Sequence, residues 1–328
     1  MRGRRTVIAR LALLLALLFV LPAAAEPIRM SASGVELDAR RPNVKRVGQL
    51  DFVAGFDLTS RHARFGGYSG MIIDEGGLRL VAVSDLGHWL VARLRRDEAG
   101  RLTGVGEAEI HPMLDRNGRP FTIKRAGDAE ALESLPDGSL LVAFEQVHRV
   151  LRYAGPEPWR SAAEVQAVPA ALRRQASNGG VETMARFPDG RLLLVSEADE
   201  RADGTLSAWL RTGSEWADLS YAQSDSYRPV DAKVLPDGDL LVLERYFTLL
   251  GGFSSRLVRV AAGDVRPGAT MRGRMIAEIS SPMITDNFEA LAVEPAPDGG
   301  IFVFILSDDN RVAIERTLLL QFRLIPSG

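Results

Sequence analysis

A hairpin pattern recurs five times along this chain and constrains the fold more than any other feature. Each copy has about six residues of strand character, a turn that contains glycine, and a run rich in Val, Leu, Ile and Phe. Most of the turns are Pro-Asp-Gly, in which proline presets φ and glycine accepts a positive φ. The copies are 69–85, 128–145, 180–197, 230–245 and 287–310. Successive turns lie roughly 45 to 65 residues apart, the spacing of propeller blades rather than of solenoid repeats.

The segments between the hairpins predict two further strands after each of the first four copies. They are 88–96 and 104–112, 149–155 and 163–169, 205–213 and 216–222, and 255–263 and 275–281. We therefore predict an all-β fold, a β-propeller of five four-stranded blades, with six blades as the alternative. After the fifth copy only 317–325 remains. We expect the N-terminal strand 47–58 to pair with this last blade, which closes the ring and removes its exposed edges.

Domain organisation follows from the same pattern. We expect a single propeller domain over 45–326, preceded by an N-terminal extension at 26–44. Helix content is expected to be low, because the best helical candidate, 161–175, contains Pro169 and is limited to a turn or two. The four tryptophans lie in or beside outer strands, and we expect them to pack between blades.

The N-terminus has the pattern of a secretory signal peptide. Basic residues precede an apolar run from Leu11 to Leu21, and small residues end at Ala25, so we expect a signal peptide at 1–25. Arg4-Arg5 leaves a twin-arginine route open beside the general one. We expect a periplasmic or secreted protein. No second long apolar run follows, so we expect no membrane span in the mature chain.

Charge and cysteine content exclude several classes of protein. The net charge of −2 lacks the basic surplus that a nucleic-acid partner requires, so we expect none. The absence of cysteine excludes a disulfide framework, a thiolate metal site and a cysteine nucleophile. We expect a monomer that acts on a small molecule.

Carboxylates recur at both open ends of the hairpins. In a blade, the start of the first strand and the end of the second lie on the same face. We place these acids at those two positions: Glu130 and Glu145, Glu182 and Glu197, Asp231 and Glu244, Glu289 and Asp308, and Asp85 of the first copy, where Gly70 holds the inner position. The aspartates of the Pro-Asp-Gly turns lie on the opposite face and are interpreted as turn formers.

Such a rim of acids needs a counter-charge, because two ionised carboxylates in contact near a protein surface repel by ~4 kcal/mol. A hard divalent cation can supply it through oxygen ligands, with Ca²⁺ favoured over Mg²⁺ because its geometry is tolerant. Arginines can supply it instead, and Arg125, Arg149, Arg201, Arg245 and Arg311 lie on or next to the same loops. Each acid can also simply bind neighbouring backbone N–H groups.

Other candidate residues are isolated. Ser69 lies in Gly-Gly-Tyr-Ser-Gly, but the Gly-x-Ser-x-Gly spacing of a nucleophile elbow fails at Met71, so a turn serine is the interpretation. His88 and His148 follow strand ends on the acidic face, where each can be a general acid or a solvated loop residue.

Several of these stretches together resemble the exported bacterial family named for the esterase-like activity of phytase. They are FGGYSGM, AVSDLGHWLVARL, GDAEALESLPDGSLLVAFEQVHRVLRY, NGGVETMARFPDGRLLLVSE, LPDGDLLVLERYF and DNFEALAVE, and the resemblance covers about 45–325. It implies a phytase-like propeller and hydrolysis of an ester or phosphoester.

The function we expect is metal-assisted phosphoester hydrolysis at the acidic rim, with Ca²⁺ as the cofactor. Carboxylester hydrolysis and a non-catalytic propeller that binds a ligand or protein are the alternatives. The expected metal ligands are Glu130, Glu182, Asp231, Glu289, Asp308 and Asp85. The catalytic candidates are Glu145, Glu197 and Glu244 as further ligands or bases, and Arg149 and Arg245 as groups that grip substrate oxygens.

Overall fold

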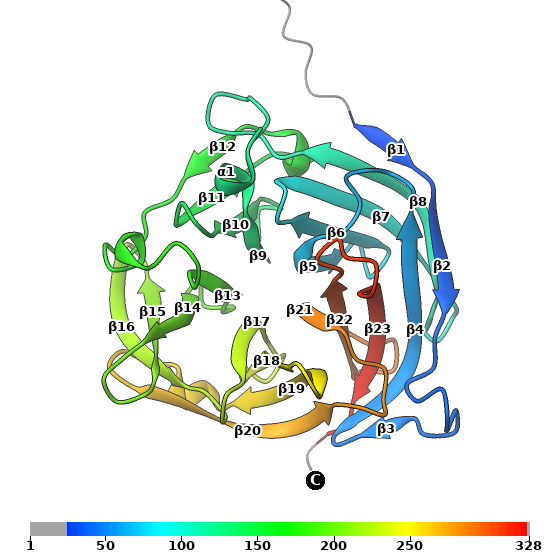
Figure 1. The fold of residues 1–328 in the computed structure, drawn as a ribbon. Coiled ribbons are helices and arrows are strands. Elements are labelled where there is room, and N and C mark those ends of the chain that lie inside the picture. The colour runs from blue at the N-terminus through cyan, green and yellow to red at the C-terminus, as the bar shows by residue number, and fades with distance from the viewer. Residues whose placement is uncertain (1–24, 327–328) are drawn as a thin grey trace, which may run out of the picture.

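Strands make up nearly all the regular structure of residues 25–326, the part of the chain that the computed structural model describes. The strands form four sheets, which surround a central axis (Figure 1). Apart from Ala25, the expected signal peptide at 1–25 lies outside the described residues.

The first two sheets each consist of antiparallel strands in nearly sequential order. The first has the order β1-β8-β7-β6-β5, with β1 (Glu26–Ile28), β5 (Tyr68–Asp74), β6 (Arg79–Ser84), β7 (His88–Arg96) and β8 (Leu102–Pro112). The second has the order β12-β11-β10-β9, with β9 (Ala129–Ser134), β10 (Leu140–Phe144), β11 (Arg149–Tyr153) and β12 (Ala163–Val165). Strand β1 belongs to the expected N-terminal extension and pairs along the outer edge of the first sheet.

The third sheet joins two four-stranded units through their outermost strands. The first unit contains β13 (Val181–Arg186), β14 (Leu192–Glu200), β15 (Leu206–Thr212) and β16 (Glu215–Ala222). The second contains β17 (Arg228–Val234), β18 (Leu240–Thr248), β19 (Gly252–Val260) and β20 (Thr270–Ile279). Strands β16 and β20 run parallel and pair over three residues, so the two units are continuous at the outside of the ring.

The fourth sheet joins the two ends of the described chain. It contains β21 (Asn287–Pro295), β22 (Ile301–Asp308), β23 (Thr317–Leu324), β4 (Leu50–Ser60), β2 (Met30–Gly34) and the short β3 (Arg46–Val47). Strand β4 pairs antiparallel with β23 from Leu50↔Leu324 to Leu58↔Thr317. The pairing of the N-terminal strand with the last hairpin, expected from the sequence, is therefore confirmed.

The innermost strands of these units contact one another in a closed circle. Strand β5 packs against β9, β9 against β13, β13 against β17, β17 against β21, and β21 against β5. Each inner strand begins, and its partner strand ends, at the face turned toward the viewer in Figure 1, which we call the front face. The Pro-Asp-Gly turns lie at the opposite ends of the same strands.

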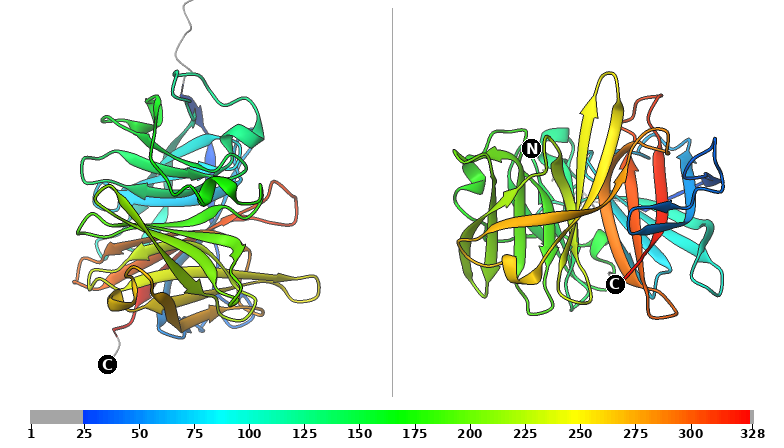
Figure 2. Two further views of the ribbon diagram at one scale, coloured as in Figure 1. Left: turned by 90° about the vertical axis from the view of Figure 1, so that its left-hand side faces the viewer. Right: turned by 90° about the horizontal axis from the view of Figure 1, so that it is seen from below.

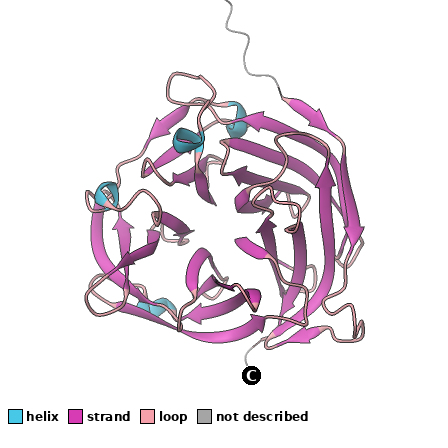
Figure 3. Cartoon of the chain, viewed as in Figure 1, coloured by secondary structure: helices cyan, strands magenta, loops and turns pink. Residues whose placement is uncertain are grey.

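Helices are few and short, as expected. The described residues contain α1 (Lys124–Gly127) and single 3-10 turns at Pro158–Arg160, Leu172–Arg174 and Ala262–Asp264 (Figure 3). The helical candidate 161–175 forms strand β12 and one of these turns. No helix within 25–326 is long and apolar enough to cross a membrane.

The hydrophobic core is divided into clusters that lie between neighbouring sheets and units. Trp89 is fully buried where the first sheet meets the second, and its ring packs edge-on against Tyr153 at 5.1 Å. Trp159 joins the same cluster, and Trp209 lies between β13–β16 and the second sheet with Trp216 beside it. The expected packing of tryptophans between blades is confirmed. Burying each large apolar side chain contributes about 1.5–3 kcal/mol, so these contacts hold the units in position.

Gly70 tests how closely the inner strands are packed. A Cβ atom on Gly70 would lie 2.8 Å from the backbone nitrogen of Leu132 on the adjacent inner strand, closer than real Cβ contacts. Gly70→Ala is expected to lower the free energy of unfolding by about 1–3 kcal/mol, as overpacked core positions do. Gly34→Ala is the control, because a Cβ there meets nothing within 4 Å. Urea unfolding that gives both variants the same stability would contradict this close packing.

Candidate functional site

A β-bulge occurs near the start of each inner strand and leaves one residue of that strand without a partner. In each hairpin the register slips by one residue, so that one side chain of the inner strand has no partner in the ladder. The residues at this bulge position are Ser69, Glu130, Glu182, Val230 and Glu289. Three of the five are therefore glutamates.

The second strand of each hairpin contributes one more side chain at the same height. On the inner strand, one paired residue precedes the bulge, and its partner lies on the second strand. The side chain in question belongs to the residue that comes directly after this partner in the sequence. These residues are Asp85, Glu145, Glu197, Arg245 and Asp308. We call the seven acids of these two sets the acidic ring: Asp85, Glu130, Glu145, Glu182, Glu197, Glu289 and Asp308.

Two groups of carboxylates in this region are close enough to share a metal ion. Asp128, Glu130 and Glu145 each offer an oxygen, and these oxygens lie within 4.8 Å of one another. Glu145, Glu182 and Glu197 form a second such group, so Glu145 belongs to both. The N–H groups of Gly179 and Gly180 donate to Glu145 Oε1, which orients its carboxylate.

Asp128 is a site residue that our sequence analysis missed. It precedes β9 and is almost fully buried. Its Oδ2 accepts a hydrogen bond of 2.5 Å from Gln146 Nε2. The signal in the sequence is its spacing of two residues from Glu130, since alternate residues of an extended chain face the same side.

Burial and mutual repulsion disfavour the ionised forms of several acids. Burial, reinforced by neighbouring carboxylates, raises the pKa of Glu130 and of Glu182 well above the usual value. Burial and the nearby Glu289 raise the pKa of Asp308 to about 9. Burial also raises the pKa of Glu289, although the charge of Arg245 acts against it. Without a further cation, the ring therefore holds protons at neutral pH.

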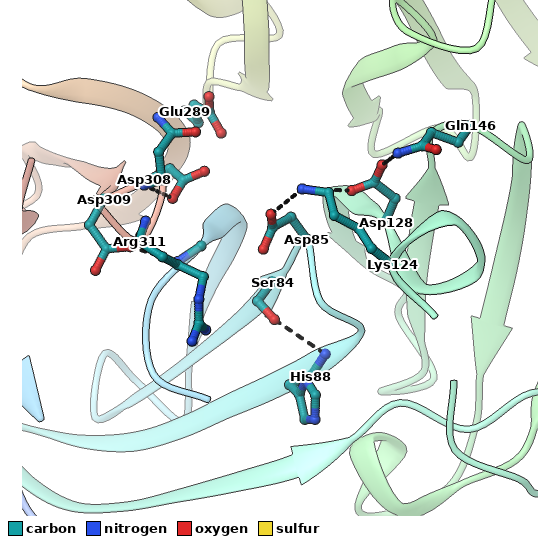
Figure 4. A network of polar contacts seen from close by, with 12 residues as sticks. Ser84, Asp85, His88, Lys124, Asp128, Gln146, Glu289, Asp308, Asp309 and Arg311 are labelled. Atoms are coloured by element: carbon teal, nitrogen blue, oxygen red, sulfur yellow. Dashed lines mark hydrogen bonds and ion pairs between the residues drawn. The ribbon is translucent and has the colours of Figure 1, made fainter. Parts of the chain in front are cut away.

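Among the residues that the structure describes, two side chains supply positive charge to the ring. Arg245 donates from Nη1 to Glu289 Oε1 at 2.5 Å, and its Nη2 lies 3.3 Å from Glu197 Oε1. Lys124 extends from α1, pairs with Asp85, and lies 3.6 Å from Asp128 Oδ1 (Figure 4). Two cations cannot balance seven acids, so arginine pairing provides only part of the counter-charge.

Two unsatisfied oxygens test whether a cation fits here. Asp85 Oδ1 and Asp128 Oδ1 are buried and accept no hydrogen bond among the described residues. A buried carboxylate oxygen without a donor costs free energy, which a bound cation would recover. The donors are all carboxylate oxygens, the set that suits hard divalent ions. The residues present therefore fit a metal ion.

Asp231, an expected metal ligand, does not belong to the acidic ring. Val230 occupies the bulge position, so Asp231 is displaced by one residue and is fully buried. Its Oδ2 accepts from Leu291 N at 2.7 Å, and its Oδ1 lies 3.1 Å from Lys233 Nζ. Both oxygens are therefore already bound.

Glu244 is displaced in the same way. It pairs across from Pro229 and lies one residue before Arg245, the ring position. Its carboxylate accepts hydrogen bonds from the hydroxyls of Tyr221, at 2.8 Å, and of Ser224. The sequence contains a signal for this displacement. Glu145, Glu197 and Arg245 each lie eight residues after the aspartate of their own Pro-Asp-Gly turn, and Glu244 does not.

Arg149 is also away from the ring. Its guanidinium lies 4.1 Å from the ring centre of Phe144 and donates to the carbonyl oxygens of Val147 and Ala126. Burial lowers its pKa. Arg149, an expected substrate-binding group, therefore connects two front-face loops through these contacts. His148 is likewise bound, with Nε2 2.7 Å from Ala176 O.

A cavity of about 620 Å³ opens on the front face beside Lys124. His88, Phe121 and Ile123 contribute to its wall together with Arg64. Burial lowers the pKa of His88 to about 4, so its imidazole is neutral at neutral pH. This cavity provides space for an organic group beside Lys124, the side chain that pairs with Asp85 of the acidic ring.

Asp308 is expected to make the stability of the folded protein depend on pH. Its pKa of about 9 in the folded state exceeds the ordinary 3.8, so the folded state keeps a proton that the unfolded chain gives up above pH 4. The resulting loss of stability grows from about pH 4 to about pH 9, stays constant above that, and is absent below about pH 4. In chelator, Asp308→Asn is expected to raise the melting temperature at pH 8 and to leave it unchanged near pH 4. The amide oxygen can still accept from Asn310 N, as Asp308 Oδ1 does at 2.7 Å. Equal melting curves at both pH values would contradict the proposed repulsion.

Comparisons with known proteins give one family and several distant structures. A gluconolactonase from Xanthomonas campestris is 14% identical, with 92% of this chain and 96% of that chain covered and a TM-score of 0.42. A Dyadobacter fermentans protein of unknown function is 12% identical, with 91% and 95% covered and a TM-score of 0.43. At these values we take no functional role from either. No curated protein sequence matches.

The family match covers most of the described structure. The model of the family described as "Phytase-like: Esterase-like activity of phytase" matches residues 63–311, which include every member of the acidic ring. The resemblance noted from the sequence is confirmed, and this chain belongs to the family named for the esterase-like activity of phytase.

Proposed function

We propose that this chain is an exported, metal-dependent hydrolase of small phosphate esters. The proposal includes one domain at 45–326 built as five four-stranded blades, counted from the five inner strands in the circle. Export rests on the signal-peptide pattern at 1–25, and membership of the family supports hydrolysis of an ester. We keep the expectation that the protein is a monomer.

The observation that carries the proposal is the pair of carboxylate groups that share Glu145. They lie next to buried oxygens without donors, and within residues 25–326 only Lys124 and Arg245 offset their charge. We propose Ca²⁺ as the ion, because its flexible coordination tolerates ligands that come from several different strands. When bound, such an ion supplies a Lewis acid for the ester oxygen and lowers the pKa of a water molecule.

The protein groups around this centre have separate proposed tasks. Glu130, Glu145, Glu182 and Glu197, with Asp128, hold the ion, while Glu289 orients Arg245 through a 2.5 Å hydrogen bond. The guanidinium of Arg245 is the group that binds phosphate oxygens, because its planar fork donates two parallel hydrogen bonds. The cavity beside Lys124 receives the organic part of the ester.

The first test is metal-dependent stability and turnover. At a free Ca²⁺ concentration about 100 times its Kd, binding stabilises the folded state by about 2.7 kcal/mol. We expect Ca²⁺ to raise the melting temperature, chelator to reverse the rise, and aryl phosphates to be hydrolysed only with Ca²⁺. Glu145→Gln, which removes a charge from both groups, should abolish the rise in melting temperature. Glu244→Gln is the matched control, since that residue lies outside the ring.

The assay outcomes separate the alternatives. Hydrolysis of aryl acetates that survives chelator would favour a carboxylester hydrolase. A Ca²⁺-dependent rise in melting temperature without turnover of phosphate or acyl esters would favour a non-catalytic binding protein. Melting curves unaffected by Ca²⁺ or chelator would refute the metal centre.

Arg245 tests the proposed substrate contact. Arg245→Gln removes a charge-assisted hydrogen bond worth about 1.5–3 kcal/mol, so kcat/KM for aryl phosphates should fall roughly 10- to 100-fold. The same change removes a positive charge beside the acids, so the affinity for Ca²⁺, measured calorimetrically, should increase. Arg245→Lys keeps the positive charge, so its Ca²⁺ affinity should equal that of the wild type. Its kcat/KM should stay below the wild-type value, because lysine lacks the planar guanidinium that donates two parallel hydrogen bonds. An unchanged kcat/KM in Arg245→Gln would make Arg245 a purely structural residue.

A further inference from the structure

The cavity on the front face shares two chain segments with the carboxylates of the candidate site. Its wall contains Leu86 and His88, which follow the ring residue Asp85 in the sequence. It also contains 120–124, which leads through α1 to Asp128, a member of one of the two carboxylate groups. Each segment therefore carries both a carboxylate of the site and a part of the wall. We call this space of about 620 Å³ the front cavity.

Five of the ten residues that line the front cavity are apolar. They are Leu86, Pro112, Pro120, Phe121 and Ile123. Phe121 packs against the ring of Phe144, with ring centres 5.6 Å apart, so this part of the wall is held in position. Ile123 is 63% exposed, which leaves its side chain available to an occupant. The volume is within the range of about 300–1,000 Å³ that is usual for sites of organic ligands, and covering apolar surface stabilises such a complex.

The charged side chains of the front cavity already have partners. Arg64 Nη1 donates to Glu26 Oε1 at 2.6 Å, and Lys124 pairs with Asp85 of the acidic ring. Among residues 25–326, Arg64 and Lys124 are the only cationic side chains in the wall, since burial lowers the pKa of His88 to about 4 and leaves its imidazole neutral. A further anionic group on a ligand would therefore find no unpaired cation among these residues.

The most projecting segment of the front face does not cover the front cavity. Figure 2 shows the β18–β19 hairpin, in yellow, extending beyond the other strands. This hairpin lies across the ring from α1 in Figure 1, and none of its residues lines the cavity. Thr122 and Ile123, which do line it, are exposed. An organic group can therefore enter from solvent.

We propose that the front cavity binds the alcohol part of the substrate and selects phosphate monoesters of uncharged, apolar alcohols over those of polyols and multiply phosphorylated alcohols. This inference rests on the proposed hydrolysis of phosphate esters. An apolar alcohol is stabilised when it leaves water for the apolar wall. Hydroxyl and phosphate groups would lose their hydration and find few free partners, because the charged groups of the wall are already bound.

The first test compares three substrates in the presence of Ca²⁺. Benzyl phosphate and glycerol 3-phosphate are both esters of primary alcohols, so their leaving groups differ mainly in polarity. We expect kcat/KM to be about 10-fold higher for benzyl phosphate, and lowest for fructose 1,6-bisphosphate, which carries a second phosphate. Equal values for the three esters, or the highest value for the bisphosphate, would overturn the inference and leave the proposed hydrolysis intact.

The second test measures binding without turnover. Benzylphosphonate and methylphosphonate share a phosphonate that cannot be hydrolysed, so calorimetry with the Ca²⁺-loaded protein isolates the contribution of the benzyl group. The wild type should bind benzylphosphonate about 10-fold more tightly than methylphosphonate. Ile123→Ser should lower this preference severalfold and leave the Kd of methylphosphonate unchanged. Val165→Ser is the matched control, since Val165 is 58% exposed on the outer strand β12, and it should keep the wild-type preference.

The outcomes separate this inference from the function on which it rests. Equal affinity of the wild type for the two phosphonates, or an undiminished preference in Ile123→Ser, would overturn the role of the front cavity even if aryl phosphates are hydrolysed. Failure to hydrolyse any phosphate ester with Ca²⁺ would overturn the proposed hydrolysis and this inference with it. Melting curves of Ile123→Ser and Val165→Ser, both changed only at exposed positions, verify that each variant remains folded.

Discussion

Apolar packing between neighbouring sheets and units holds together a set of carboxylates that would otherwise separate. The clusters that contain Trp89, Trp209 and Phe288 lie between adjacent units and leave the inner strands in direct contact around the axis. Each inner strand carries its bulge near the front face, so the acids converge there. A pair of ionised carboxylates in contact costs ~4 kcal/mol near a protein surface, and the packing has to sustain several such pairs.

The protein relieves this repulsion in three ways at once. Protons stay on the most buried acids, as the raised pKa values of Glu130, Glu182 and Asp308 indicate. Arg245 replaces an acid at one ring position, and Lys124 reaches Asp85 from a loop. The oxygens of Asp85 and Asp128 that still lack a donor mark where the compensation is incomplete. Asp128 belongs to one of the two carboxylate groups that are proposed to hold the cation.

The sequence predicted much of the fold, because its signals are local. Strand alternation, Pro-Asp-Gly turns and their spacing correctly indicated the hairpins and the pairing of β4 with β23. The same signals located Glu130, Glu145, Glu182 and Glu197, which the structure brings together. In the hairpin of β17 and β18 they pointed to Asp231 and Glu244, whereas the equivalent positions are held by Val230 and Arg245, because the bulge shifts the register by one residue. The contacts of Arg149 with Phe144 and two carbonyl groups could not be predicted, because these partners come together only in the folded loops.

The sequence by itself determined the repeated hairpin, the strand order and the presence of an acid near most hairpin ends, since each depends on residues close together in the chain. Only the tertiary structure decided which acids share a site, that Glu145 belongs to two groups, and that Arg245 occupies the position of a carboxylate. It also showed that Leu86, His88 and 120–124 line one cavity. These facts depend on bulge positions and on contacts between distant hairpins, which arise when apolar faces pack around a common axis.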